Sequence, residues 1–164
     1  MPSHIIVQWN NSYSVGIKVI DEQHMKLIKL TNKLFSSCIS GQEKTTADYV
    51  FMNVLHEVID YAGYHFSTEE KIMERINYPD YKKHKKEHVD FVKEVLVKVE
   101  DFNEGKLNTS LSFVYYLRNW VLEHIAVNDK KLGQYLLDLK KNGELEQIVI
   151  KVKKDEETNK LTVV

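Results

Sequence analysis

The chain has 164 residues, which is long enough for one domain with a substantial buried core. Hydrophobic residues make up 43% and charged residues 29%, a balance typical of a globular protein and not of a disordered one. The formal net charge of -1 argues against a basic surface for nucleic acid or anionic lipid, and the single cysteine, Cys38, excludes an internal disulfide and a thiolate metal cluster. Because the sequence has no membrane-length apolar run and no secretory signal, we expect a soluble cytoplasmic protein without membrane or nucleic-acid partners.

The N-terminal part of the chain predicts an arm followed by a first helix. Residues 1–20 are expected to form the arm, which carries Trp9. The helix is expected to begin near Asp21, where apolar residues start to recur at i, i+3 and i+4 spacing. The inward stripe of this helix comprises His24, Leu27, Ile28, Thr31, Leu34, Phe35 and Cys38.

Three further amphipathic helices are predicted. The second is expected after Thr45 and Thr46, the third from Pro79, and the fourth after the candidate cap residues 108–110. Four amphipathic helices with short connections predict an all-α fold, an up-down-up-down antiparallel four-helix bundle. The inward stripes comprise Phe51, Val54, Leu55, Val58, Ala62, His65, Glu69, Ile72 and Met73, then His84, His88, Phe91, Val95, Val99 and Phe102, then Phe113, Leu117, Trp120, Val121 and His124.

The C-terminal tail has a different pattern. Residues 147–164 hold two β-branched stretches around a polar turn, which predicts a short β-hairpin. A lone two-stranded hairpin is marginal in water, so it should dock on the bundle, pair with another chain or fray. We therefore divide the chain into residues 1–142, the bundle with its arm, and residues 143–164, a tail that could bind a partner protein or mediate self-association.

Five histidines and two acids fall on the inward stripes or close to them. His84 and His88 sit in a lysine-rich run, but their i, i+4 spacing puts them on one face that continues into Phe91, which predicts that both rings point inward. His65 and Glu69 have the same spacing, and a cation would remove the cost of burying that carboxylate without a partner. The full set of candidate metal ligands is His24, His65, Glu69, His84, His88, His124 and Asp129.

The fourth helix carries the weakest geometric link in this set. His124 and Asp129 are five residues apart, which turns their side chains onto different faces of a regular α-helix. If both residues bind the same metal centre, the helix must loosen locally. The spacing therefore predicts a π-bulge, or unwinding near Asn128.

Each residue taken alone has a less specific interpretation. A lone inward histidine such as His24 is more often a hydrogen-bonded core residue than a ligand, and His65 with Glu69 could be an ordinary i, i+4 pair. The conjunction of seven such residues from four helices favours metal, because buried together without one they would be hard to satisfy. The remaining histidines, His4 and His56, are assigned to no site.

The ligand types limit the metal without identifying it. Imidazole and carboxylate suit iron, zinc, copper or manganese. Seven protein ligands are too many for one tetrahedral zinc ion. They fit two ions of higher coordination number that are bridged by the two carboxylates.

In their order along the chain, these residues resemble the bacterial hemerythrins over about residues 9–142. The resemblance implies a non-haem di-iron centre, with two iron ions cycling between Fe2+ and Fe3+ and a bridging oxo or hydroxo group, that binds O2 reversibly. Each motif alone is weak, but the ordered set is highly specific. The motifs are Val15-Gly16-Ile17, Ile20-Asp21-Glu22-Gln23-His24, His65-Phe66-x-x-Glu69-Glu70, Met73, Tyr78-Pro79, His84-x-x-x-His88, Phe91, Trp120-x-x-x-His124-Ile125 and Asp129-Lys130.

The resemblance also implies a role for each ligand. His84, His88 and His124 would hold one iron, His24 and His65 the other, and Glu69 and Asp129 would bridge them. The second iron then has one fewer protein ligand, and O2 is expected to bind there. Candidates for the apolar wall of the O2 pocket are Leu27, Phe66, Trp120 and Val121, for which plain core packing is an equally good interpretation.

The expected function is oxygen transport, storage or delivery, without enzymatic activity. One rival is a di-iron oxidase, peroxidase or nitric oxide reductase. Ferritin-like di-iron proteins use Glu-x-x-His pairs, and this sequence contains none, which favours binding over oxygen activation. A second rival is an O2 or iron sensor in which residues 143–164 supply the partner surface.

Overall fold

The computed structural model describes residues 5–39, 43–104 and 110–145, apart from the side chains of residues 44, 45 and 110. The predicted hairpin, with the rest of residues 146–164, lies outside the described residues. Within the described chain the elements in order are the short 3-10 helix η1 (Asn11–Tyr13), α1 (Lys18–Cys38), α2 (Lys44–Arg75), α3 (Tyr81–Asn103), α4 (Ser110–His124), the π-helix η2 (Ile125–Asp129) and α5 (Lys130–Lys141).

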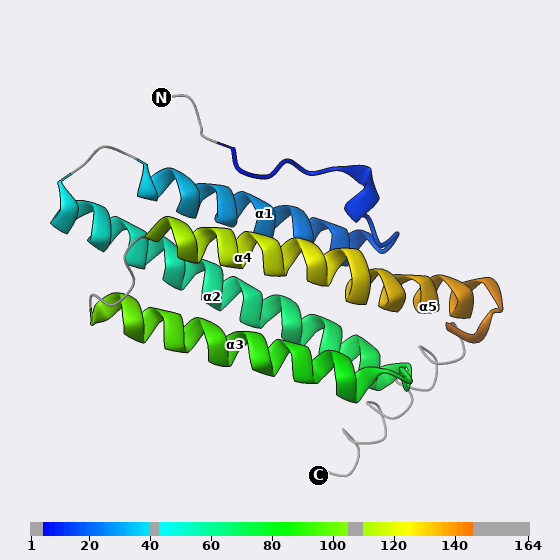
Figure 1. Ribbon diagram of the computed structural model, residues 1–164. Coiled ribbons are helices and arrows are strands. Elements are labelled where there is room, and N and C mark those ends of the chain that lie inside the picture. The colour runs from blue at the N-terminus through cyan, green and yellow to red at the C-terminus, as the bar shows by residue number, and fades with distance from the viewer. Residues whose placement is uncertain (1–4, 40–42, 105–109, 146–164) are drawn as a thin grey trace, which may run out of the picture.

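The helices pack as an up-down-up-down antiparallel bundle (Figure 1). α1 packs against α2 and α4, and α2 packs against α3. α5 continues the line of α4 through η2, so the last three elements act as one long helix. The predicted all-α four-helix bundle is confirmed. Among the described helices, none is both long enough and apolar enough to cross a membrane.

The first helix begins earlier than predicted. α1 starts at Lys18 and not near Asp21. Asp21 instead binds the arm. The Asp21 carboxylate accepts hydrogen bonds from the Ser14 hydroxyl at 2.6 Å and from the Val15 backbone N–H at 2.8 Å. Asp21 therefore lies within the first turn of α1, and its hydrogen bonds attach the arm to that helix.

The third helix begins later than predicted. α3 starts at Tyr81, two residues after Pro79. Asn77 in the preceding turn has φ of 50°, a left-handed backbone conformation that asparagine tolerates better than most residues. The chain therefore completes its reversal through Pro79 before helical geometry resumes.

The N-terminal arm is fixed at both ends. The backbone N–H groups of Ile6 and Val7 donate to Asn32 Oδ1 at 3.0 and 3.1 Å, and the Asn32 amide donates back to the Val7 carbonyl at 2.7 Å. At its other end the arm touches α5, where a Cβ added to Gly133 would lie 2.4 Å from the Val15 carbonyl oxygen. Only glycine allows this approach, because any side chain would collide with the backbone.

Two apolar clusters fill the bundle, and the candidate ligands lie between them. On α1, for example, His24 lies between Ile20 of the smaller cluster and Leu27 of the larger one. The bundle therefore has a polar layer with apolar packing on either side. The larger cluster comprises Leu27, Leu30, Leu34, Phe51, Val54, Leu55, Val58, Ala62, Phe66, Phe91, Val95, Phe113, Val114, Leu117, Val121 and Ile125, and the smaller one Val15, Ile20, Met73, Ile76, Tyr78, Leu132, Leu136 and Leu139.

Candidate metal centre

The seven candidate ligands meet in one buried layer of the bundle, and none is more than 4% exposed. Their ligand atoms form two groups, each within a span of 4.8 Å. We call these the three-histidine group, which is His84, His88 and His124 with Glu69, and the two-histidine group, which is His24 and His65 with Glu69 and Asp129. Glu69 belongs to both groups. His56, which was assigned to no site, is exposed on α2.

The π-helix brings His124 and Asp129 to the same side of their helix. η2 spans Ile125–Asp129, which adds a residue to the turn that separates the two side chains. The Nε2 atom of His124 consequently lies 3.1 Å from Oδ1 of Asp129. The predicted loosening of this helix is confirmed, and it takes the form of a π-helix.

The rings of the three-histidine group converge through their Nε2 atoms. His84 Nε2 lies 3.1 Å and His88 Nε2 lies 3.0 Å from Nε2 of His124. A neutral imidazole nitrogen either donates or accepts one hydrogen bond, so a single nitrogen cannot satisfy both neighbours. A separation of about 3.0 Å is also that of two ligands at right angles on a metal with bonds of about 2.1 Å. The spacing therefore suits a shared cation.

Each acid faces both groups. Asp129 places Oδ1 at 3.2 Å from Nε2 of His84 and Oδ2 at 3.0 Å from Nε2 of His24. Glu69 places Oε2 at 3.4 Å from Nε2 of His84 and Oε1 at 3.7 Å from Nε2 of His65. A carboxylate with one oxygen toward each group has the arrangement of a bridging ligand.

These buried atoms lie close together without aligned hydrogen bonds. Among the described residues, both carboxylate oxygens of Glu69 and of Asp129 and both ring nitrogens of His24 lack a hydrogen-bond partner. Leaving a buried polar group unsatisfied costs about 1–3 kcal/mol, and more when the group is charged. A cation between the oxygens and the imidazoles would remove this cost, so the residues present fit a pair of metal ions.

Burial and proximity shift the pKa values within the layer in opposite directions. Burial lowers the pKa of His65 to about 3 and that of His88 to about 2. Burial also disfavours the charged form of His84, but its contacts with Asp129 and Glu69 outweigh burial and raise its pKa to about 9. Burial, reinforced by the nearby Asp129, raises the pKa of Glu69 to about 8. Metal binding would have to displace protons held in this way.

Three side chains to which the sequence assigned no role contact the outer ring nitrogens of three of the histidines. Gln23 places Oε1 at 2.9 Å from Nδ1 of His65, and Glu70 places Oε1 at 3.2 Å from Nδ1 of His88. The third, Glu87, contacts His124. Each of the three is next in sequence to a candidate ligand, and that adjacency was the signal available for finding them.

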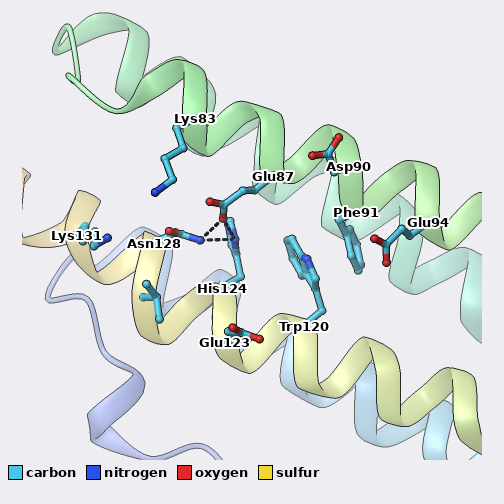
Figure 2. A pocket seen from close by; sticks show the side chains of 11 residues that line it. Lys83, Glu87, Asp90, Phe91, Glu94, Trp120, Glu123, His124, Asn128 and Lys131 are labelled. Atoms are coloured by element: carbon cyan, nitrogen blue, oxygen red, sulfur yellow. Dashed lines mark hydrogen bonds and ion pairs between the residues drawn. The ribbon is translucent and has the colours of Figure 1, made fainter.

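The outer nitrogen of His124 faces an open cleft. Nδ1 lies 3.5 Å from Oε2 of Glu87 and 3.3 Å from the side-chain amide nitrogen of Asn128, and that amide donates a hydrogen bond to Glu87. Figure 2 shows Glu87 reaching from α3 toward the other two residues on the neighbouring helix. The cleft has a volume of about 410 Å³.

A second, much smaller cavity lies inside the bundle beside the layer. It reaches His65, His124 and Asp129, and the rest of its lining is apolar. It offers about 10 Å³ to the centre of a water-sized molecule, which is about the space that one such molecule needs. All four residues predicted for the pocket wall line it: Leu27, Phe66, Trp120 and Val121.

Comparisons with known proteins point to one family. The model of the Hemerythrin HHE cation binding domain matches residues 15–136. The bacteriohemerythrin of Stenotrophomonas maltophilia is 32% identical over 125 residues, which cover 76% of this chain and 78% of that protein. A hemerythrin-like protein of Naegleria gruberi is 28% identical over 123 residues, which cover 75% of this chain and 87% of that protein. A crystal structure of wild-type hemerythrin aligns with a TM-score of 0.70 at 25% identity over 79% of this chain and 96% of its own. With a four-helix bundle and a buried histidine and carboxylate layer inside the matched residues, this chain belongs to the hemerythrin family.

Proposed function

We propose that this protein binds O2 reversibly at a non-haem di-iron centre and serves in oxygen transport, storage or delivery. Membership of the hemerythrin family supports a non-haem di-iron oxygen-binding module. The three-histidine group would hold one iron and the two-histidine group the other, with Glu69 and Asp129 as bridges. The observation that carries the proposal is that each acid directs one oxygen toward each group and has no hydrogen-bond partner among the described residues.

The two proposed iron positions differ in their number of protein ligands, and the position with fewer ligands could bind O2. The two-histidine group offers one fewer imidazole than the three-histidine group. The small apolar cavity reaches His65 and Asp129 of the two-histidine group. The cavity also reaches His124 of the three-histidine group, so a diatomic gas that enters it would lie beside both groups, and the iron with fewer protein ligands is the one that could accept it.

The apolar lining has a chemical role in this proposal. When bound, a pair of ferrous ions would supply the two electrons that O2 takes up on binding and would take them back on its release. Leu27, Phe66, Trp120 and Val121 give the cavity an apolar lining, which disfavours water there and makes a change in net charge costly. A dry cavity thus slows the proton entry and hydrolysis that would turn bound O2 into a released product.

The donor set favours binding over catalysis. Five imidazoles and two carboxylates meet in the layer, whereas ferritin-like di-iron sites are rich in carboxylates. Fewer carboxylates leave fewer groups that can shift position and accept protons during oxygen activation. Turnover of peroxide or nitric oxide by the purified protein at rates far above those of free iron would contradict this proposal.

The test is an anaerobic-to-aerobic optical titration combined with iron analysis. We expect about two irons per chain, from the number and type of ligands. Charge-transfer bands should appear with O2 and vanish under vacuum. Irreversible oxidation without an oxygenated species would overturn the proposal. His65→Ala should lose iron and thermal stability together, whereas His56→Ala, an exposed histidine on the same helix, is the matched control and should keep both.

A further inference from the structure

We propose that Glu70, Glu87 and Gln23 make the two metal positions unequal in affinity, so that the three-histidine group fills first and holds its ion more tightly. This inference rests on the proposed function, because it assumes a metal in each group. The three residues would act as positioning residues, since they touch the outer ring nitrogens of the ligands and not the metals. The ligand set already gives the three-histidine group one more imidazole, and the charge of the three positioning residues would widen that difference.

The three-histidine group is supported by carboxylates. Glu70 lies 3.2 Å from Nδ1 of His88, and Glu87 lies 3.5 Å from Nδ1 of His124. Asn128 donates a hydrogen bond to Glu87, which holds that carboxylate beside the ring (Figure 2). A carboxylate that accepts the outer N–H of an imidazole fixes the ring and increases the electron density on the nitrogen that faces the metal.

The two-histidine group has neutral support or none. Nδ1 of His65 contacts the amide oxygen of Gln23 at 2.9 Å, and the Gln23 amide nitrogen donates to Thr68 at 3.3 Å. Nδ1 of His24 is buried without a hydrogen-bond partner among the described residues. An amide oxygen carries no net charge, so it makes the imidazole a weaker donor to the metal than a carboxylate does.

The charge difference has a direct effect on metal affinity. Glu87 and Glu70 are only partly buried, with 33% and 22% of their side chains exposed, and Lys85 pairs with Glu70 at 3.0 Å. Their negative charge therefore adds to the three-histidine group without the full cost of burying a carboxylate. Gln23 is 4% exposed, a position where a charge would be more costly. Both effects favour the three-histidine group as the first to fill.

The test is a titration of the metal-free full-length chain with Co2+, followed by its visible absorption and by thermal unfolding. We expect two binding steps of unequal affinity in the wild type. Glu87→Gln and Glu70→Gln should weaken the first step by about 10-fold and leave the second unchanged, in the range observed when a partner of a ligating histidine is lost. Gln23→Glu should strengthen the second step and bring the two closer together.

Asp90→Asn is the matched control. Asp90 lines the same cleft as Glu87 and lies on the same helix, but it pairs with Lys86. Removing its charge should change neither step by more than about 2-fold, since it touches no ligand and is screened by solvent. If the wild type binds two ions with equal affinity, or if Glu87→Gln behaves like Asp90→Asn, the inference is wrong while the proposed function stands. Fewer than two bound ions in the wild type would overturn the proposed function itself.

Discussion

The apolar end of the bundle, which is the larger apolar cluster around Phe51, and the polar layer are built on the same helices but satisfy their buried groups differently. At the apolar end, Phe51 is 1% exposed and packs against Phe102 and Phe113 at ring-centroid distances of 5.0 and 6.2 Å. In the polar layer, Glu69 and Asp129 are completely buried and lack hydrogen-bond partners among the described residues. Protein atoms alone satisfy the first region, whereas the buried acids of the second lack a partner that a bound cation would supply.

This difference divides the stability of the protein into two parts. Apolar packing contributes whether or not metal is present, because burial of side-chain area is all that it requires. The polar layer contributes only when cations offset the cost of burying its acids and imidazoles. The two parts can be separated by changing one region at a time.

Metal removal should have the largest effect on stability. A ligand at a free concentration of about 100 times its Kd stabilises the native state by about 2.7 kcal/mol, so two ions contribute about 5 kcal/mol. Chelation should therefore lower the free energy of unfolding by about 5 kcal/mol and lower the melting temperature with it. The helical circular dichroism signal at low temperature should be unchanged. Equal melting temperatures with and without chelator would contradict the division.

Truncation at the apolar end should have the next largest effect, and it should not depend on metal. Phe51→Ala leaves a cavity between Phe102 and Phe113, and such substitutions cost about 3–5 kcal/mol. The loss should be the same in the metal-loaded and metal-free proteins, as measured by denaturant unfolding of both. A loss that differs between the two forms by more than about 1 kcal/mol would mean that the regions are coupled.

The contrast also explains which features the sequence could predict. Periodicity placed His84 and His88 on the inward face despite the surrounding lysines, because helix geometry within one segment is enough for that step. The five-residue spacing of His124 and Asp129 predicted, for the same reason, a local loosening of the helix, either a π-bulge or unwinding near Asn128, and the structure has a π-helix there. Features internal to one helix were therefore accessible from the chain alone.

Contacts between elements were not accessible in this way. Glu87 contacts His124 on another helix, and Val15 meets Gly133 across 118 residues of sequence. No spacing rule within one helix reports which side chain of a neighbouring helix it will meet. The start of α1 was misplaced for a similar reason, because Asp21 was interpreted as a local helix start and not as an anchor for the arm.

The substitution Glu69→Leu should have a smaller effect on stability, and the sign of this effect should depend on whether metal is bound. Both oxygens of Glu69 are buried without a hydrogen-bond partner among the described residues, so an apolar side chain should stabilise the metal-free protein by about 1–3 kcal/mol. The same change should abolish the stabilisation by metal, because a bridging ligand is lost. Denaturant unfolding with and without Co2+ measures both effects. Glu69→Gln, which keeps a buried polar group, is the control and should not gain stability.

The smallest expected effect concerns pH and again separates the two regions. Burial, reinforced by Asp129, raises the pKa of Glu69 to about 8, and contacts with the acids raise the pKa of His84 to about 9 against the effect of burial. Metal ligands must be deprotonated, so ions compete with these protons below pH values of about 8 to 9. The affinity for Co2+ should therefore rise with pH, by at most about tenfold per pH unit for each proton displaced.

Calorimetry in two buffers of different ionisation enthalpy counts the protons released on Co2+ binding. Phe51→Ala should leave that number unchanged, because the apolar end holds no titrating group of the layer. His84→Gln removes one raised pKa and should reduce the pH dependence of the remaining affinity, since one fewer proton competes with the metal. An affinity that is constant between about pH 6.5 and pH 8 would mean that metal-free Glu69 and His84 hold no such protons. The acids and imidazoles would then already be arranged for metal, and the cost of the empty layer would lie in unshielded charge and not in protonation.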